Sequence, residues 1–479
     1  MNIRTVIQDF QKLKCMTQKY FQLGQFERAL QTVYYACGFM YTMNQVLYDD
    51  ELERIVCNIA AQVVEDPDIN KCYPENIMFY DGFGNLNRGL SRIYIEALKE
   101  LGYTIKYITF SKFKGNKEEF TETVGQGNVL FIEGENFVSQ LQSLSSIVVN
   151  CSASKVFICM NPDDVVAVGV FSLFNKKIRR YLLNITDHAF WLGRTVCDKI
   201  INFREFGTKI CVDKRHIPMS KNVYIPYFPY INRNIIDEGI EDYITDKYIF
   251  SGGSIYKTES KDKRYYALVK SILDSFDVKF VFMGNGSGRS FRKLKKQYPE
   301  RVYVHKENQN FFCVLRNSVC YLSTYPYNGG LMTQYSLAAK KVPVTLCCTG
   351  VEQELSINHN NVFWNFTTME ECICEIHKLL NDESYRKYQG NRLCEFLVSP
   401  KQFKEELEVF LRDEKSIRKV STWEYEFEGF RKMPLEVYCG FRYARLFFRK
   451  RGLYLFANFP VKYVAGAIYM IWEKIYKVR

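Results

Sequence analysis

The chain has 479 residues and a mass of 56.5 kDa, too long for one ordinary hydrophobic core, so two or three domains are expected. Hydrophobic residues make up 47% and charged residues 25% of the sequence, which excludes a disordered chain. Most of the net charge of +12 lies after residue 430, where eleven Lys and Arg stand against two Glu. The rest is close to balanced, so we expect no nucleic acid among the partners.

The sixteen cysteines do not form a metal or disulfide pattern, since none lies in a CxxC pair and most stand within apolar runs. The nearest approach to a ligand set is Cys372, Cys374 and His377, and no second pair completes a zinc site. We therefore expect free thiols in a reducing cytosol and no bound metal or other cofactor. The first fifteen residues lack the apolar core of a signal peptide, which predicts a chain that is not secreted.

The pattern of apolar residues divides the chain into four parts. Apolar residues recur at three- and four-residue steps between Leu23 and Cys37, which predicts helices in the first part. Short apolar runs then alternate with amphipathic helices in two separate series, as is typical of parallel, doubly wound α/β sheets. The predicted parts are a helical N-terminal extension (1–70), a first Rossmann-like domain (71–235), a second Rossmann-like domain (236–415) and a basic, aromatic helical tail (416–479).

The elements predicted in the two series are short strands separated by helices. In the first series the strands are 76–80, 104–110, 128–132 and 155–160, with a helix over 90–101. In the second they are 247–254, 277–286, 301–306, 319–324 and 342–348, with helices over 262–276, 290–298 and 331–340. The proline-bearing stretch 222–234 is predicted to be a linker. A ligand is expected in the cleft between the carboxyl ends of the two sheets.

Two loops of the first series carry candidate functional residues. The loop after the first strand contains Gly82, Gly84, Arg88 and Gly89, and the helix N-terminus that follows it favours a phosphate. The alternative is a tight turn with a solvated arginine. The second candidate is Asp187-His188 in an aromatic setting, where an imidazole can hydrogen-bond a sugar hydroxyl or phosphate or act as a base. The alternative is a capped core histidine.

Three loops of the second series follow predicted strands, and the first two, at successive strand ends of one sheet, would face one crevice. Each could be a plain turn, but the third is a polar glycine loop that opens a helix, whose first amides could hold a diphosphate. The residues singled out as donor-binding are Gly252, Gly253, Ser254 and Lys257 in the first loop, Gly284, Asn285 and Gly286 in the second, and Asn328, Gly329, Gly330, Leu331, Gln334 and Ser336 in the third.

The stretch from Ser323 to Val344 resembles the donor-binding motif of the retaining, GT-B fold glycosyltransferases of family 4. The segments 81–90, 187–193, 203–207 and 225–229 resemble the N-terminal domain of bacterial capsule and lipopolysaccharide transferases of this kind, and the likeness covers about residues 75–415. The resemblance implies a GT-B fold in which a nucleotide sugar binds the second domain and a glycan or lipid-linked oligosaccharide acceptor binds the first. It also implies helix dipoles and cations in place of a metal ion.

This sequence departs from the family pattern at three places. Asn328 and Ser336 stand where the family has two carboxylates, and Asn and Ser cannot offset a developing positive charge as a carboxylate does. The family arginine after the first glycine pair is also missing, and Lys257 or Lys261 is the candidate replacement. The resemblance implies catalytic roles for His188, Asp187 and Asn328 in transfer to a surface polysaccharide. A non-catalytic GT-B-like subunit that binds a partner transferase or glycan, and a nucleotide-sugar epimerase, stay open as alternatives.

The tail mixes basic and aromatic residues, which suits an anchor lying on an anionic membrane surface. Residues 452–472 approach the length of a membrane span, but Pro460 and Lys462 make spanning costly. We therefore expect a cytoplasmic protein that is peripherally associated with the inner face of the cytoplasmic membrane. The alternative is a pair of helices that pack back across the two domains.

Overall fold

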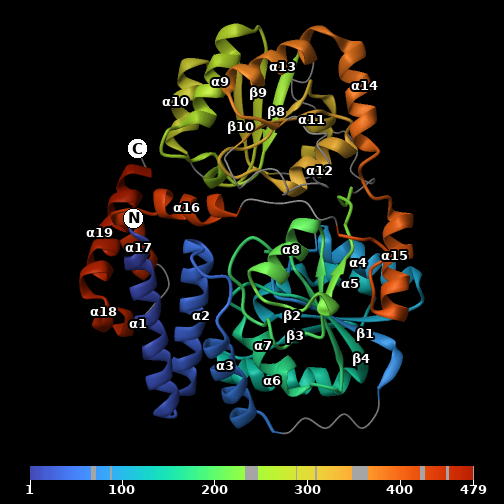
Figure 1. The fold of residues 1–479 in the computed structure, drawn as a ribbon, viewed down its shortest axis with the longest axis vertical. Helices are drawn as coiled ribbons and strands as arrows, with labels where there is room; N and C mark the ends of the chain where they lie inside the picture. Colours follow the sequence, from blue (N-terminus) through green and yellow to red (C-terminus); the bar gives the residue numbers. More distant parts are fainter. Residues whose placement is uncertain are drawn as a thin grey trace.

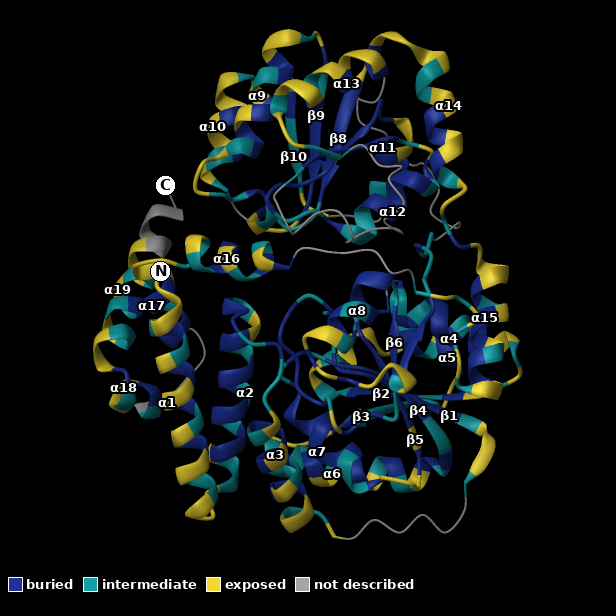
Figure 2. Cartoon of the chain, viewed as in Figure 1, coloured by how far each residue is buried: buried dark blue, intermediate teal, exposed yellow. Residues whose placement is uncertain are grey.

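The computed structural model describes residues 1–65, 72–86, 89–231, 246–286, 288–307, 310–347, 365–420, 427–448 and 453–477. Within these residues the chain forms two parallel sheets, one above the other, with a group of helices from both chain ends at one side (Figure 1). Buried residues fill both sheets, and the exposed residues lie on the outward faces of the surrounding helices (Figure 2). The predicted arrangement of two Rossmann-like domains in a GT-B architecture is confirmed.

The first sheet has seven strands in the order β3-β2-β1-β4-β5-β6-β7, and all neighbours are parallel. Its central residues Ile77, Met78 and Phe79 are completely buried, as helices on both faces require. The strands are β1 (Tyr73–Asp81), β2 (Thr104–Phe110), β3 (Val129–Ile132), β4 (Ala153–Cys159), β5 (Arg179–Leu183), β6 (Lys199–Asn202) and β7 (Asn222–Tyr224). Their helices are α4 (Leu90–Glu100), α5 (Lys117–Val124), α6 (Phe137–Cys151), α7 (Val165–Leu173) and α8 (Glu205–Asp213).

The second sheet has six strands in the order β10-β9-β8-β11-β12-β13, again all parallel. The strands are β8 (Tyr248–Gly252), β9 (Lys279–Met283), β10 (Val302–His305), β11 (Tyr321–Leu322), β12 (Pro343–Leu346) and β13 (Asn365–Phe366). Their helices are α9 (Arg264–Ser275), α10 (Arg289–Gln297), α11 (Phe311–Asn317), α12 (Gly330–Ala338), α13 (Met369–Asn381) and α14 (Glu383–Cys394).

The start of the predicted linker is a strand. Residues 222–224 form β7, which pairs with β6 through Ile200 and Asn222, because Val223 and Tyr224 complete the buried edge of the first sheet. The linker prediction therefore applies at most from Ile225 onward, and residues 232–245 lie outside the described part of the chain. The strands β5 and β6 were not predicted either, although Tyr181, Leu182 and Leu183 form a buried run.

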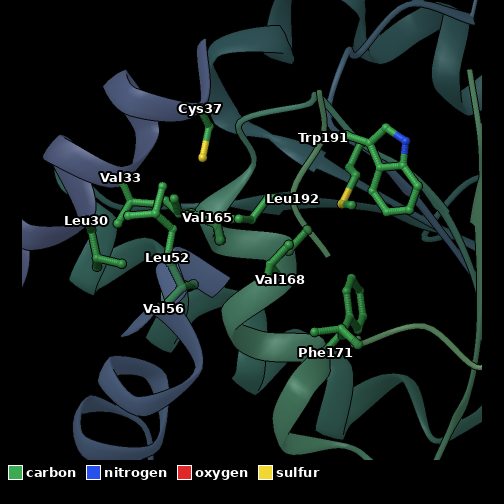
Figure 3. Packing of buried hydrophobic residues seen from close by; sticks show 14 of the residues in the cluster. Leu30, Val33, Cys37, Leu52, Val56, Val165, Val168, Phe171, Trp191 and Leu192 are labelled. Atoms are coloured by element: carbon green, nitrogen blue, oxygen red, sulfur yellow. The ribbon is translucent and has the colours of Figure 1, made fainter. Parts of the chain in front are cut away.

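The N-terminal extension packs onto the first domain. It consists of α1 (Ile3–Gln22), α2 (Phe26–Met43) and α3 (Asp50–Val63), and α2 and α3 share one apolar cluster with α7 (Figure 3). Val33, Val56 and Val168 belong to this cluster and are buried. A side chain at Gly169 on α7 would lie only 2.7 Å from Leu141 and 3.2 Å from Ala60, so the helices approach closely here.

Helix α15 (Pro400–Asp413) crosses back to the first domain. The Phe403 ring packs edge-on against Tyr94 at 4.9 Å, and the Phe410 ring packs against Tyr181 at 4.8 Å. The sequence boundaries place this helix in the second domain, but its apolar face completes the core of the first. Such a crossing cannot be inferred from apolar periodicity, since periodicity identifies the buried face of a helix and not its partner.

The tail packs against the N-terminal helices (Figure 1). Its helices are α16 (Glu428–Val437), α17 (Phe441–Phe448), α18 (Leu453–Asn458) and α19 (Pro460–Lys477). The Tyr35 hydroxyl donates to the Leu446 carbonyl at 2.9 Å, and Asp9 binds both Tyr443 and Lys462. Among the helices that the structure describes, none combines the length and the apolar character that a membrane span needs.

Candidate active site

A cleft of about 1550 Å³ opens where the two sheets, the N-terminal helices and the tail meet. Each sheet reverses its strand order at its first strand, between β1 and β4 and between β8 and β11. In open parallel sheets a ligand binds outside the carboxyl ends of the strands at such reversals. The loops that follow β5, β8, β9 and β11 all contribute to the lining. The volume exceeds the ~300–1000 Å³ typical of a small-molecule pocket, so it can accommodate two substrates.

Asp187 is a buried ion-pair partner in the loop after β5. Its carboxylate accepts from Nε of Arg204 at 2.6 Å and binds a second guanidinium nitrogen of the same residue. Burial alone would raise the pKa of Asp187, but the Arg204 guanidinium outweighs burial and holds this pKa far below its ordinary value. Asp187 is therefore ionised near pH 7, and its ion pair fixes the loop.

Arg215 binds the backbone of the same loop. It is fully buried, and its guanidinium donates to the carbonyl of Asp187 at 2.8 Å and to the carbonyl of Ala189. The guanidinium also lies 4.8 Å from the centre of the Trp191 ring. A buried cation bonded to two backbone carbonyls and packed against an aromatic face orders the backbone on both sides of His188.

His188 lies in the cleft with 34% of its side chain exposed. Its Nδ1 is 3.3 Å from Asp187, and its ring packs at 5.3 Å from Phe430 of α16. Asn44, at the end of α2, donates to the His188 carbonyl at 2.9 Å. Residues from three parts of the chain therefore hold His188, two of them at its ring and Asn44 at its backbone.

The charge state of His188 follows from its surroundings. Burial lowers its pKa below the ordinary value of 6.5, and the cations Arg204 and Lys257 act in the same direction, whereas Asp187 opposes them. The ring is therefore neutral near pH 7, with Nε2 available to accept or donate a hydrogen bond according to its tautomer. Lys257 belongs to the second domain and lines the same cleft as His188, so the two domains approach each other at this point.

Asn328 lies on the opposite wall, in the loop between β11 and α12. The Thr324 hydroxyl closes this loop by donating to the Tyr327 carbonyl at 2.6 Å. The Tyr327 amide donates to the Lys257 carbonyl at 3.4 Å, which joins the loops on the two sides of the strand reversal. The first turns of α12 add three more of the predicted residues to the lining, namely Gly330, Leu331 and Gln334.

Ser336 and Gly329 do not line the cleft. Ser336 is completely buried, and its hydroxyl donates to the Thr333 carbonyl within α12 at 2.7 Å. Gly329 is buried at the start of the same helix. In this structure the side chain at position 336 therefore satisfies its own helix rather than facing a ligand.

The glycines after β8 and β9 serve the packing of the two loops. A Cβ at Gly284 would lie 1.7 Å from the carbonyl oxygen of Gly253, so the two backbones touch and no side chain fits. A Cβ at Gly252 would lie 3.1 Å from Met332. Gly252 and Gly284 are buried, and Gly253 and Ser254 are half-buried, but none of the four lines the cleft. The predicted residues of these loops that do line it are Lys257, Asn285 and Gly286.

The loop after β1 is held by hydrogen bonds to a buried aspartate. Asp81 accepts from the amides of Phe83 and Gly84 at 2.9 and 3.1 Å, and from Ser91 and Tyr107. Burial raises the pKa of Asp81 despite these donors. Neither Gly82 nor Gly84 lines the cleft, whereas Gly89 does. Arg88 lies outside the described residues.

The sequence prediction missed the contributions of the helical parts to the cleft. Residues from α2, α16, α17 and α19 line it, and the pattern of the sequence gave no sign that the two ends of the chain meet there. The missed lining residues include Tyr41, Thr42 and Asn44 from α2 and its end, Phe430, Pro434 and Val437 from α16, Arg442 and Arg445 from α17, and Tyr469 and Trp472 from α19.

Comparison with known proteins identifies the fold. No family model and no curated protein matches the sequence. A glycosyltransferase from Rickettsia africae superposes with a TM-score of 0.51 at 14% identity, over 72% of this chain and 98% of that one. The Anabaena protein HepE in complex with UDP and glucose gives 0.51 at 11% identity, over 70% and 99%. A UDP-GlcNAc 2-epimerase from Neisseria meningitidis bound to UDP-GlcNAc gives 0.50 at 11% identity, over 71% and 100%.

These structural relatives include both glycosyltransferases and epimerases, and their identity to this chain is low. The likeness extends over about seven tenths of the chain, which is less than the whole because the relatives are shorter. The two facing parallel sheets with the cleft between them are those of the GT-B fold. The chain has the GT-B fold.

Proposed function

We propose that the protein is a glycosyltransferase that moves a sugar from a nucleotide-sugar donor onto a glycan acceptor. The observation that carries the proposal is that His188 of the first domain and Asn328 of the second line one cleft at the carboxyl ends of both sheets. A donor held by one domain and an acceptor held by the other would meet between these two side chains.

The donor would bind the second domain. The amides at the start of α12 are suited to a phosphate, because a helix N-terminus combines free N–H groups with a favourable dipole. Lys257 adds a cation from the neighbouring loop, in place of the arginine that similar transferases carry there. Asn328 and Gln334 can hydrogen-bond sugar or ribose hydroxyls. The neutral ring of His188 would accept or donate a hydrogen bond at the transferred sugar.

The resemblance to family 4 supports the finer parts of the proposal. These are a retaining, metal-independent reaction and an acceptor in a surface polysaccharide such as capsule, lipopolysaccharide or exopolysaccharide. Asn328 replaces the family carboxylate at the sugar, so the stabilisation of positive charge would fall to the donor's own phosphates. A nucleotide-sugar epimerase is the second candidate, favoured by the epimerase among the structural relatives.

The decisive experiment measures nucleotide release from UDP-, GDP-, CMP- and dTDP-sugars, with and without acceptor-rich membranes, in the presence of EDTA. We expect one donor to turn over, to require the acceptor for full rate, and to be unaffected by EDTA. Loss of turnover in EDTA that Mg²⁺ restores would contradict metal independence.

The same experiment separates the alternatives. Conversion of the donor to an isomeric nucleotide sugar without acceptor use would identify an epimerase. Absence of both turnover and donor binding, with intact folding, would favour the non-catalytic GT-B-like subunit and contradict the proposed transfer.

The proposal also includes peripheral attachment to an anionic membrane through α19. Apolar side chains at Val461, Val464, Ile468 and Ile471 recur at three- and four-residue steps and are 47–80% exposed. Lys462, however, forms an ion pair with Asp9 within the protein, so its charge is not available to a lipid headgroup. Attachment would therefore rest mainly on the apolar residues.

Attachment predicts a measurable effect of two substitutions. Ile468→Ser combined with Ile471→Ser should lower co-sedimentation with phosphatidylglycerol vesicles more than about tenfold, since each buried isoleucine contributes roughly 1.5–3 kcal/mol. The control is Leu23→Ser with Ile417→Ser, which removes two side chains that are 59% and 57% exposed at other places. Equal sedimentation of both variants and the wild type would rule out attachment through this face.

A further inference from the structure

The lining of the cleft is strongly cationic. Eight Lys and Arg side chains contribute to it, against Asp187 and Glu259 as the only carboxylates among the described lining residues. Both carboxylates already bind one of these cations, Asp187 with Arg204 and Glu259 with Lys263. The other six cations are Lys257, Arg289, Arg292, Lys293, Arg442 and Arg445. A site with this excess selects a ligand that carries several negative charges.

Three of the six cations lie on one face of α10. The helix is anchored by Phe291 and Leu294, which are buried in the second domain. Arg289, Arg292 and Lys293 follow at the three- and four-residue spacing that brings side chains together on a helix, and all three line the cleft. Within the described part of the chain, neither Arg292 nor Lys293 forms an ion pair, so both charges are available to a ligand.

The facing wall is formed by α17 and α19. Arg442 and Arg445 lie three residues apart on α17 and both line the cleft, and Arg442 forms no ion pair with a described residue. The rings of Tyr469 and Trp472 line the cleft, with centroids 5.8 Å apart and planes inclined by 29°. The ring of Phe441 lies parallel to that of Tyr469 at 6.5 Å but does not itself line the cleft. The guanidinium of Arg289 lies 5.3 Å from the Trp472 ring, which joins the two walls.

We infer that the space between α10 and α17 binds the acceptor, and that the acceptor is a glycan bearing phosphate or carboxylate groups. This inference rests on the proposed function and names its acceptor class. Guanidinium and ammonium groups recognise the anionic groups, while flat aromatic rings suit the apolar faces of sugars. The donor's phosphates are provided for by Lys257 and the start of α12, so they do not account for the cations of α10 and α17.

A membrane surface fits this place less well. The cationic residues line a concave cleft that continues to His188 and Asn328, whereas a lipid surface is flat and would meet only the exposed side of α19. An extended chain can enter the cleft and bring its end to the reacting sugar.

The test compares an anionic and a neutral oligosaccharide of the same length, octagalacturonate and maltooctaose, by titration calorimetry on the full chain. We expect the wild type to bind octagalacturonate more tightly, with an affinity that falls as salt is raised. Arg292→Gln with Lys293→Gln should weaken this binding about tenfold or more, because charge-assisted hydrogen bonds are lost. Arg442→Gln on the facing wall should also weaken it.

The matched control is Lys295→Gln with Lys296→Gln. It removes the same charge from the same helix, at exposed positions that do not line the cleft, and should change the affinity less than about twofold. Equal losses in both double variants, or equal binding of the two oligosaccharides, would overturn the inference.

Two further measurements distinguish an acceptor site from a donor site and from a membrane-binding surface. A loss of UDP affinity in the Arg292/Lys293 variant without a loss of octagalacturonate binding would assign these cations to the donor and overturn the inference. A loss confined to sedimentation with phosphatidylglycerol vesicles would assign them to a membrane surface. Anionic glycan binding in a protein that turns over no donor would leave the site standing and contradict the proposed transfer instead.

Discussion

Replacement of His188 by glutamine is expected to lower donor turnover by roughly 100-fold or more, the usual contribution of a positioned acid–base or hydrogen-bonding group. Glutamine has a similar length and keeps the contact with Phe430. Asp187 keeps its ion pair with Arg204, so the free energy of unfolding should change by less than about 1 kcal/mol. Turnover and urea unfolding of the same preparation measure the two effects.

The pH profile distinguishes a chemical role of His188 from a structural one. Since its pKa is lowered, the ring stays neutral as the pH falls through 6.5, and wild-type turnover should begin to decline only below that value. The decline should be absent from the residual activity of the glutamine variant. His377→Gln is the control, because His377 is exposed on α13, away from the cleft. Turnover within threefold of the wild type in both variants would show that His188 takes no part.

Asp187→Asn is expected to have the largest effect on stability. It leaves the guanidinium of Arg204, whose side chain is only 14% exposed, without its anion, and breaking such a pair from one side costs roughly 3–5 kcal/mol. Urea unfolding at pH 7 measures the loss. The control is Asp50→Asn, which breaks the pair between Asp50, whose side chain is 51% exposed, and Arg194, whose guanidinium keeps its bond to the Arg215 carbonyl. It should cost less than about 1 kcal/mol. Equal losses in the two variants would contradict the assigned role.

The pH dependence of unfolding gives a second measure of the same pair. The pKa of Asp187 is lower in the folded than in the unfolded protein, where its ordinary value is 3.8. Its contribution to stability is therefore complete above pH 3.8 and is lost as the pH falls from there towards the folded pKa. The wild type should lose stability in that acid range more steeply than Asp187→Asn does.

Local sequence patterns predicted β1 to β4 and β8 to β12, because strand, loop and helix follow one another along the chain there, but they did not predict β5, β6, β7 and β13. The predicted strand 104–110 coincides with β2, and the predicted helix 290–298 is displaced by one residue from α10. The packing of α15 on the first domain depends on partners such as Tyr94, some 300 residues away, which no local pattern encodes. The meeting of Asp9 with Lys462 lay beyond prediction for the same reason.

Part of the candidate site could be predicted from a residue's type and its place after a predicted strand. Asn328 met both conditions and lines the cleft, whereas His188, which also lines it, was singled out by its type and its neighbour Asp187 alone, because β5 was not predicted. Gly284 met them too, but it is required by the carbonyl of Gly253, a contact between two backbones that the sequence does not reveal. The role of Arg204 escaped prediction because its partner Asp187 lies on another element, and lone arginines are usually solvated surface residues.

Because residues from near both ends of the chain line the cleft, the cleft is complete only after the tail has been synthesised. Asp9 and Lys462 are separated by 453 positions, and a ribosome adds about 5–20 residues per second, so α1 waits roughly 20–90 s for its partner to be made. During that interval the Phe39 ring of α2 lacks its contacts with Tyr443 and Phe447 of α17. Both Rossmann-like domains can close first. The wall that carries Arg442 and Trp472 is thus the last part of the cleft to exist.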